Sequence, residues 1–125
     1  MTDKKTILLV EDDAFVSDIY QTKLEQEGFG LILAENGLEA MKRMEEKVPD
    51  LILLDIIMPY MGGIEVLKKL KADERWKKIP VIILTNLSQK EEVDEGLSIG
   101  ADDYLIKSHF TPSEVIGKVK ALLEK

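Results

Sequence analysis

Four short apolar runs in this sequence are each followed at once by polar side chains. The runs and the residues after them are TILLV with Glu11-Asp12-Asp13, LILL with Asp55, VIIL with Thr85 and YLI with Lys107. If these runs are parallel strands of one sheet, their carboxyl ends lie at the same edge, which is where open α/β sheets bind ligands. We therefore treat the carboxylates, the hydroxyl and the ammonium as candidates for a single site.

Such a group of side chains suits phosphoryl chemistry. Two carboxylates about 5 Å apart repel by about 3 kcal/mol at an effective dielectric near 20, so the cluster needs a cation or a proton. Oxygen ligands without His or Cys favour a hard ion such as Mg2+. Lysine and threonine suit a phosphoryl group, one as a charge and the other as a hydrogen-bond donor. Asp55, alone after an aliphatic run, is the best candidate for a nucleophile that accepts this group as an acyl phosphate.

The elements that must position these side chains alternate between strand and helix. Short runs that are apolar on both faces predict buried parallel strands at 6–10, 31–34, 51–54, 81–84 and 104–106. Amphipathic or capped segments predict helices at 14–27, 38–47, 64–72, 90–99 and 112–124, the last opening with the capping box Thr111-Pro112-Ser113-Glu114. This alternation predicts an α/β fold with a doubly wound, five-stranded parallel sheet.

Composition limits which domain organisations, partners and locations we expect for this protein. The chain has 125 residues and 45% apolar content, which suits one domain with one core. The formal charge of -7 argues against a nucleic-acid partner, because binders of the phosphate backbone rely on clustered Lys and Arg. No apolar run reaches membrane-spanning length, so we expect no membrane partner. Cysteine is absent, which is compatible with a cytoplasmic location.

Four motifs carry a resemblance to a known family. They are ILLVEDD, DIIMPYMGG, LTNL and GADDYLIK, in this order along the chain. Together they make the sequence similar to the receiver domain of two-component response regulators, from about Lys5 to Leu123. The resemblance implies a flavodoxin-like receiver fold with strand order 2-1-3-4-5. It also implies a cytoplasmic phosphoprotein of a phosphorelay.

The resemblance assigns a role to each matching residue. It implies that Asp55 is the phosphoacceptor and that Lys107 and Thr85 contact the phosphoryl group. It implies a Mg2+ site formed by Asp12, Asp55, the backbone carbonyl of Ile57 and, through bound water, Glu11. Thr85 and Tyr104 would form the switch that responds to phosphorylation. We expect Asp13 to serve the start of the first helix instead.

Ser108 and Asn86 are among the residues that depart from the family pattern. The family usually has proline after the lysine, joined by a cis bond, whereas Ser108 follows Lys107. Because a cis bond before a non-proline residue costs about 2.5 to 4 kcal/mol, the alternatives are a trans bond with a reshaped loop or a strained cis bond held by Lys107, and we expect the trans bond. Asn86 stands where the family usually has a small residue, and its amide would either crowd the pocket or donate a hydrogen bond into it.

Partners and boundaries follow from the same resemblance. We expect residues 1–125 to form a single receiver domain without an output domain, which is phosphorylated by a histidine kinase or a phosphotransfer protein. The downstream protein is unknown; it would bind the face formed by the fourth helix, the fifth strand and the fifth helix. We expect a monomer or a phosphorylation-dependent dimer. The domain would be no enzyme in the usual sense, because it catalyses only its own phosphorylation and dephosphorylation.

The sequence is compatible with other interpretations. A pseudo-receiver, which keeps the fold as an interaction module without using phosphate, gains weight from Ser108 and Asn86. A phosphatase of small metabolites fits less well, because no second acid follows two residues after Asp55. Tyr104 is also compatible with ordinary packing. Trp76 and His109 are expected in loops, without a chemical role.

Overall fold

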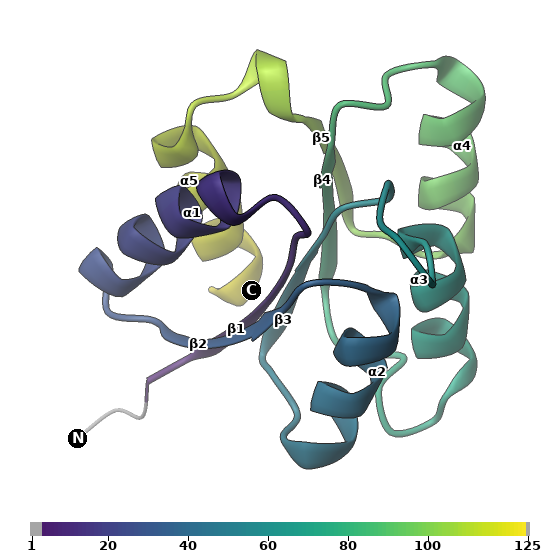
Figure 1. Ribbon diagram of the computed structural model, residues 1–125, viewed down its shortest axis with the longest axis horizontal. Helices are drawn as coiled ribbons and strands as arrows, with labels where there is room; N and C mark the ends of the chain where they lie inside the picture. Colours follow the sequence, from purple (N-terminus) through teal and green to yellow (C-terminus); the bar gives the residue numbers. More distant parts are fainter. Residues whose placement is uncertain (1–3, 125) are drawn as a thin grey trace.

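The computed structural model describes residues 4–124, which form one layer of strands between two layers of helices (Figure 1). All strand pairs are parallel, and the order across the sheet is β2-β1-β3-β4-β5. The strands are β1 (Thr6–Val10), β2 (Gly30–Ala34), β3 (Leu51–Leu54), β4 (Val81–Thr85) and β5 (Asp103–Ile106). The predicted fold class and strand order are confirmed.

Helices cover both faces of the sheet, with α1 and α5 on one side and α2, α3 and α4 on the other (Figure 1). Their bounds are α1 (Ala14–Gln26), α2 (Gly37–Glu46), α3 (Gly63–Ala72), α4 (Lys90–Ile99) and α5 (Pro112–Leu123), and a short 3-10 helix, η1 (Lys107–His109), follows β5. The predicted elements are all present, and their ends differ by no more than one residue.

The core consists of two apolar layers that share the sheet. Side chains alternate across a strand, so Ile7 and Leu9 of β1 pack with α1 and α5, whereas Leu8 and Val10 pack with the other helices. All five residues of β1 are buried. Burial on both faces explains why the strands are continuous apolar runs, and it holds the strand ends in fixed positions.

The ends of several helices have the caps that their sequences favour. Asn36 accepts a hydrogen bond from the backbone of Glu39 and begins α2. At α5 the predicted capping box is present, because Thr111 and Glu114 each accept a hydrogen bond from the other's backbone N–H. These caps define where each helix leaves the strand ends.

Trp76 lies in the loop after α3, as expected, but its side chain belongs to the core. It is 3% exposed, and the Arg75 guanidinium lies 4.1 Å from its ring centroid. The same guanidinium pairs with Glu45 of α2 and with Asp73. This loop therefore attaches α2 to the end of α3. None of the helices formed by residues 4–124 is long and apolar enough to cross a membrane.

Candidate functional site

The polar residues at the strand ends meet at one edge of the sheet. Glu11 follows β1, Asp55 follows β3, Thr85 ends β4 and Lys107 follows β5. Three of these are buried despite their polarity: Glu11 is 5% exposed, Asp55 7% and Thr85 0%. The side chains that the sequence predicted to form one site are thus brought together.

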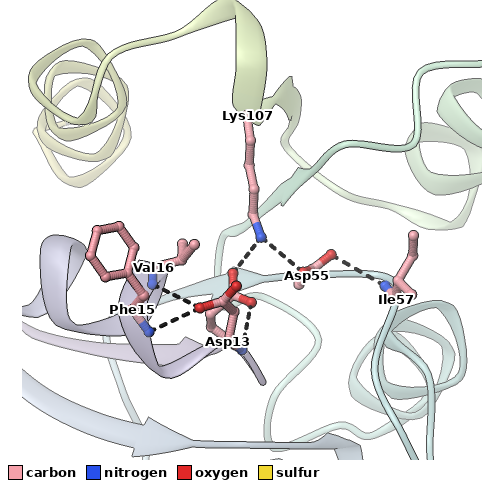
Figure 2. A network of polar contacts seen from close by, with 7 residues as sticks. Asp13, Phe15, Val16, Asp55, Ile57 and Lys107 are labelled. Atoms are coloured by element: carbon pink, nitrogen blue, oxygen red, sulfur yellow. Dashed lines mark hydrogen bonds and ion pairs between the residues drawn. The ribbon is translucent and has the colours of Figure 1, made fainter.

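Lys107 connects the ends of three strands (Figure 2). Its Nζ donates hydrogen bonds to Oε1 of Glu11 at 2.5 Å and to Oδ2 of Asp55 at 2.9 Å. Both ion pairs are largely shielded from solvent, which strengthens the attraction compared with surface pairs. Sequence reasoning foresaw Lys107 at the site but not its contact with Glu11.

The pKa values of Glu11 and Lys107 are both shifted by burial and by the hydrogen bonds of these side chains. Burial raises the pKa of Glu11 above its ordinary value of 4.5, and the hydrogen bonds from Lys107 and from the backbone of Asp13 oppose the rise only in part. Burial alone would lower the pKa of Lys107. The hydrogen bonds with Glu11 and Asp55 outweigh burial, so its pKa is raised and the ammonium stays charged.

Three carboxylates of the site are close enough to share a cation. Glu11, Asp12 and Asp55 each offer a carboxylate oxygen, and these oxygens lie within 4.8 Å of one another. Asp12 is exposed, whereas the other two are buried. All the ligands are hard oxygen atoms, and three negative charges face one ammonium. These residues fit a small divalent cation of the Mg2+ type, for which such ligands are typical.

Asp13 has a different role from its acidic neighbours. Its Oδ1 accepts hydrogen bonds from the backbone N–H groups of Phe15 and Val16, so it is the N-cap of α1 (Figure 2). Its own N–H donates to Oε2 of Glu11 at 3.1 Å. The expectation that Asp13 serves the helix start is confirmed.

Asp55 is held by the loop that follows it. The N–H of Ile57 donates to Oδ1 of Asp55 at 3.2 Å, which leaves the other carboxylate oxygen to Lys107 (Figure 2). The N–H of Gly63 donates to the carbonyl of Ile56 at 2.9 Å. A Cβ on Gly63 would lie 2.2 Å from the Asp55 carbonyl oxygen, so only glycine allows α3 to start here. Gly63 belongs to the motif DIIMPYMGG, but the sequence did not indicate this close approach.

The hydroxyl of Thr85 is buried and makes no hydrogen bond within residues 4–124. Leaving such a group unsatisfied costs about 1 to 3 kcal/mol. Oxygen atoms of a phosphoryl group are suitable partners for a hydroxyl donor at this position. The unsatisfied hydroxyl is therefore a second feature that fits an added anion at this edge of the sheet.

Comparison with known proteins agrees with this geometry. The family model for response regulator receiver domains matches residues 7–120. The chain belongs to this family. The phosphate regulon transcriptional regulatory protein PhoB of Pseudomonas aeruginosa is 40% identical to it over 121 residues, which is 97% of this chain and 52% of that protein.

Two further matches cover nearly all of this receiver. The alkaline phosphatase synthesis transcriptional regulatory protein PhoP of Bacillus subtilis is 42% identical over 123 residues, 97% of this chain and 49% of that protein. The structure of the receiver domain of the Francisella response regulator 1452 superposes with a TM-score of 0.88 at 36% identity, covering 97% of this chain and 98% of that one. The receiver thus spans about half the length of these curated relatives.

Tyr104 of the receiver has its ring directed inward. It is 9% exposed, and its hydroxyl donates to the carbonyl of Leu87 at 2.7 Å, in the loop between β4 and α4. Burial raises the pKa of Tyr104, and the charges of Glu92 and Asp55 add to the rise. The tyrosine is thus attached to the loop that follows Thr85.

The residue after Lys107 does not prevent the lysine from reaching the site. No cis peptide bond occurs among residues 4–124, so the bond from Lys107 to Ser108 is trans, as expected. Lys107 begins the 3-10 helix η1. Asn86 is exposed and lines a groove of about 330 Å³ together with Ser108 and Lys107.

Proposed function

We propose that this receiver domain is a phosphorylation-dependent switch that accepts a phosphoryl group on Asp55. The observation that carries the proposal is the position of Lys107, whose ammonium binds Asp55 and Glu11 at once. A buried carboxylate beside a fixed cation is ready to accept a group that brings more negative charge.

The phosphodonor is a phosphohistidine of a histidine kinase or a phosphotransfer protein. An Oδ atom of Asp55 attacks the phosphorus; the new O–P bond forms as the P–N bond breaks, and the imidazole leaves with the electron pair. Lys107 stabilises the added charge, and the hydroxyl of Thr85 donates a hydrogen bond to a phosphoryl oxygen.

Glu11, Asp12, Asp55 and the carbonyl of Ile57 are the groups that would hold Mg2+. The ion supplies positive charge that offsets the carboxylates and the transferred group. Asp12 is the most accessible of the acids, so it offers the entry point. The acidic set alone makes a metal-free pocket unfavourable for a further anion, which explains why a cation is needed.

Output passes through a protein that binds the face formed by α4, β5 and α5. Tyr104 lies on β5 of this face, Thr85 ends the neighbouring strand β4, and the loop from Thr85 leads into α4. A hydrogen bond from Thr85 to the phosphoryl group shifts this loop and with it the Leu87 carbonyl that holds Tyr104. The formal charge of -7 supports a protein target over a nucleic acid for this domain.

The pseudo-receiver alternative rested on Ser108 and Asn86. Lys107 reaches both carboxylates although serine follows it, and Asn86 is exposed. The contacts of Lys107 support a domain that uses phosphate.

Mass spectrometry of the intact protein tests the phosphoacceptor. With acetyl phosphate and Mg2+ we expect a mass increase of one phosphoryl group in the wild type and none in Asp55→Asn. Asp13→Asn is the matched control, because asparagine caps a helix as well as aspartate and the variant should be labelled like the wild type. A wild type that is not labelled, or equal labelling of Asp55→Asn, would contradict the proposal.

A further inference from the structure

Gly96 lies in the middle of α4 and is buried. Glycine within a helix is about 1 kcal/mol less favourable than alanine, so a packing reason is needed for its presence. A Cβ built on Gly96 would lie 2.6 Å from Cδ1 of Ile83 and 3.2 Å from Cδ2 of Tyr104. The second ring carbon, Cε2 of Tyr104, is 3.4 Å away. The missing side chain thus makes room for two residues of the sheet, one of which is the tyrosine next to the site.

The inward ring of Tyr104 fills this space. The Cδ2 and Cε2 atoms of the ring lie beside the space where a side chain on Gly96 would begin, and the hydroxyl is bonded to Leu87, two residues after Thr85. Ile83 pairs with Tyr104 across β4 and β5, and it is completely buried. A ring pushed away from α4 cannot move into Ile83, so the free direction is outward to solvent.

A second helical glycine shows that this contact is specific. Apart from its chain neighbours and the nearby backbone of its own helix, a Cβ added at Gly117 of α5 would have no atom of residues 4–124 within 4 Å, so no packing neighbour in that range requires glycine there. The same change to alanine at both positions therefore adds one methyl group to a helix, but only at Gly96 does it meet the tyrosine.

We propose that Gly96 is a positioning residue for Tyr104: the absence of a side chain on α4 provides the space that keeps the ring inward and its hydroxyl on the Leu87 carbonyl. Adding a methyl group at this position shifts the ring towards its outward orientation. The packing argument is independent of phosphate, whereas its meaning for a switch rests on the proposed function.

The other two tyrosines of the chain serve as references for measuring the exposure of Tyr104. Tyr20 is 5% exposed and Tyr60 is 84% exposed, so they mark the buried and exposed limits for a tyrosine ring. NMR of tyrosine-labelled protein with a soluble paramagnetic agent measures how far solvent reaches each ring. In the wild type, without Mg2+ or phosphodonor, Tyr104 should be protected almost like Tyr20.

In Gly96→Ala we expect the signal broadening of Tyr104 to rise towards that of Tyr60, while Tyr20 is unchanged. Gly117→Ala should leave all three tyrosines as in the wild type. Unchanged protection of Tyr104 in Gly96→Ala, or the same loss in Gly117→Ala, would overturn the proposal.

A second variant separates positioning from general damage to the core. Ile83→Val removes Cδ1, the atom that a Cβ at 96 would approach most closely. In the double variant Gly96→Ala/Ile83→Val the ring regains room, so protection of Tyr104 should return most of the way to the wild-type level. A double variant that folds without this return contradicts the proposal. If neither variant folds while Gly117→Ala does, Gly96 serves the packing of α4 as a whole and the proposal is wrong.

The outcome is distinct from that of the phosphorylation experiment. The tyrosine measurement uses no phosphodonor, so it can succeed in a protein that is not labelled on Asp55. Labelling of Asp55 with Tyr104 unmoved in Gly96→Ala would leave the proposed function standing and remove only the role of Gly96.

Discussion

The four acids of the pocket differ in what they bind within the protein. Asp13 caps a helix, Glu11 and Asp55 share the ammonium of Lys107, and Asp12 is exposed at the edge of the cluster. Side chains of the same chemistry thus have different tasks, because burial and partners differ from one to the next. Glu11 is the clearest case, since burial raises its pKa although it faces a lysine.

This raised pKa predicts the pH dependence of stability. Between about pH 4.5 and the higher pKa of the folded state, an unfolded Glu11 has lost its proton to a greater extent than the folded one, so the stability contributed by this group falls as pH rises through the folded pKa. The Glu11→Gln variant has no titratable carboxyl group at this position, so it does not undergo this loss of stability. We expect the free energy of unfolding of the variant to increase relative to the wild type between pH 4.5 and neutral pH, in urea titrations with EDTA.

Glu27 serves as a control, because its pKa is shifted in the opposite direction from that of Glu11. Its hydrogen bond with Lys120 lowers its pKa, so the wild type gains stability over Glu27→Gln above the ordinary pKa and loses it as pH falls. The effect should be small, because Glu27 is exposed. A difference between wild type and Glu11→Gln that stays constant with pH would show that the glutamate titrates as it does when unfolded.

At the amino ends of the strands, away from the site, the same contact between a strand residue and an aspartate occurs twice and fixes where the strand starts. The N–H of Thr6 donates to Oδ2 of Asp50 at 2.7 Å, and the N–H of Asp50 donates back to the Thr6 carbonyl at 2.8 Å. Val81 and Asp102 form the same reciprocal pair, with both bonds at 2.8 Å. Each aspartate thereby satisfies the first N–H of a strand and sets where β1 and β4 begin.

Loss of one such contact should be measurable. Asp102→Ala leaves the N–H of Val81, a fully buried residue, without its acceptor, so we expect a destabilisation of about 1 to 3 kcal/mol in chemical denaturation. Asp102→Asn keeps an acceptor oxygen and should recover most of the loss. As a surface control, Asp94→Ala removes an exposed pair with Lys90 and should cost no more than about 0.5 kcal/mol. Equal effects of the two alanine variants would argue against the role of this contact.

In the molecule as a whole, two apolar core layers share one sheet, and acidic side chains gather at the carboxyl ends of its strands. The core buries both faces of every central strand, and the strand ends concentrate negative charge in a protein that is already at -7. Part of the stability gained in the core is therefore opposed by repulsion at the site, and a bound cation would relieve it.

This balance predicts how Mg2+ changes stability. Without metal, Asp12→Ala should raise the melting temperature, by a gain of about 1 kcal/mol, because it removes one exposed charge from the cluster. With Mg2+ at about 100 times its dissociation constant, the wild type should gain about 2.7 kcal/mol and the variant much less. Thermal unfolding in EDTA and in Mg2+ measures both. A variant that melts below the wild type in EDTA would mean that repulsion is not significant here.

The sequence by itself determined the alternation of strands and helices, the chemical nature of the strand ends and the helix starts at Asp13 and Thr111. These features are local: periodicity reports which faces are buried, and a cap involves residues within one turn. Because parallel strands end at one edge, the meeting of Asp55, Thr85 and Lys107 also followed.

Only the tertiary structure decided how these residues contact one another. The bond from Lys107 to Glu11, the inward ring of Tyr104, the burial of Trp76 and the close approaches at Gly63 and Gly96 all join residues from different elements. Such contacts depend on the distances and angles between packed elements. A pattern along one segment carries no information about these distances, so the same glycine indicates a weak helix position in the sequence and provides space for a tyrosine in the folded protein.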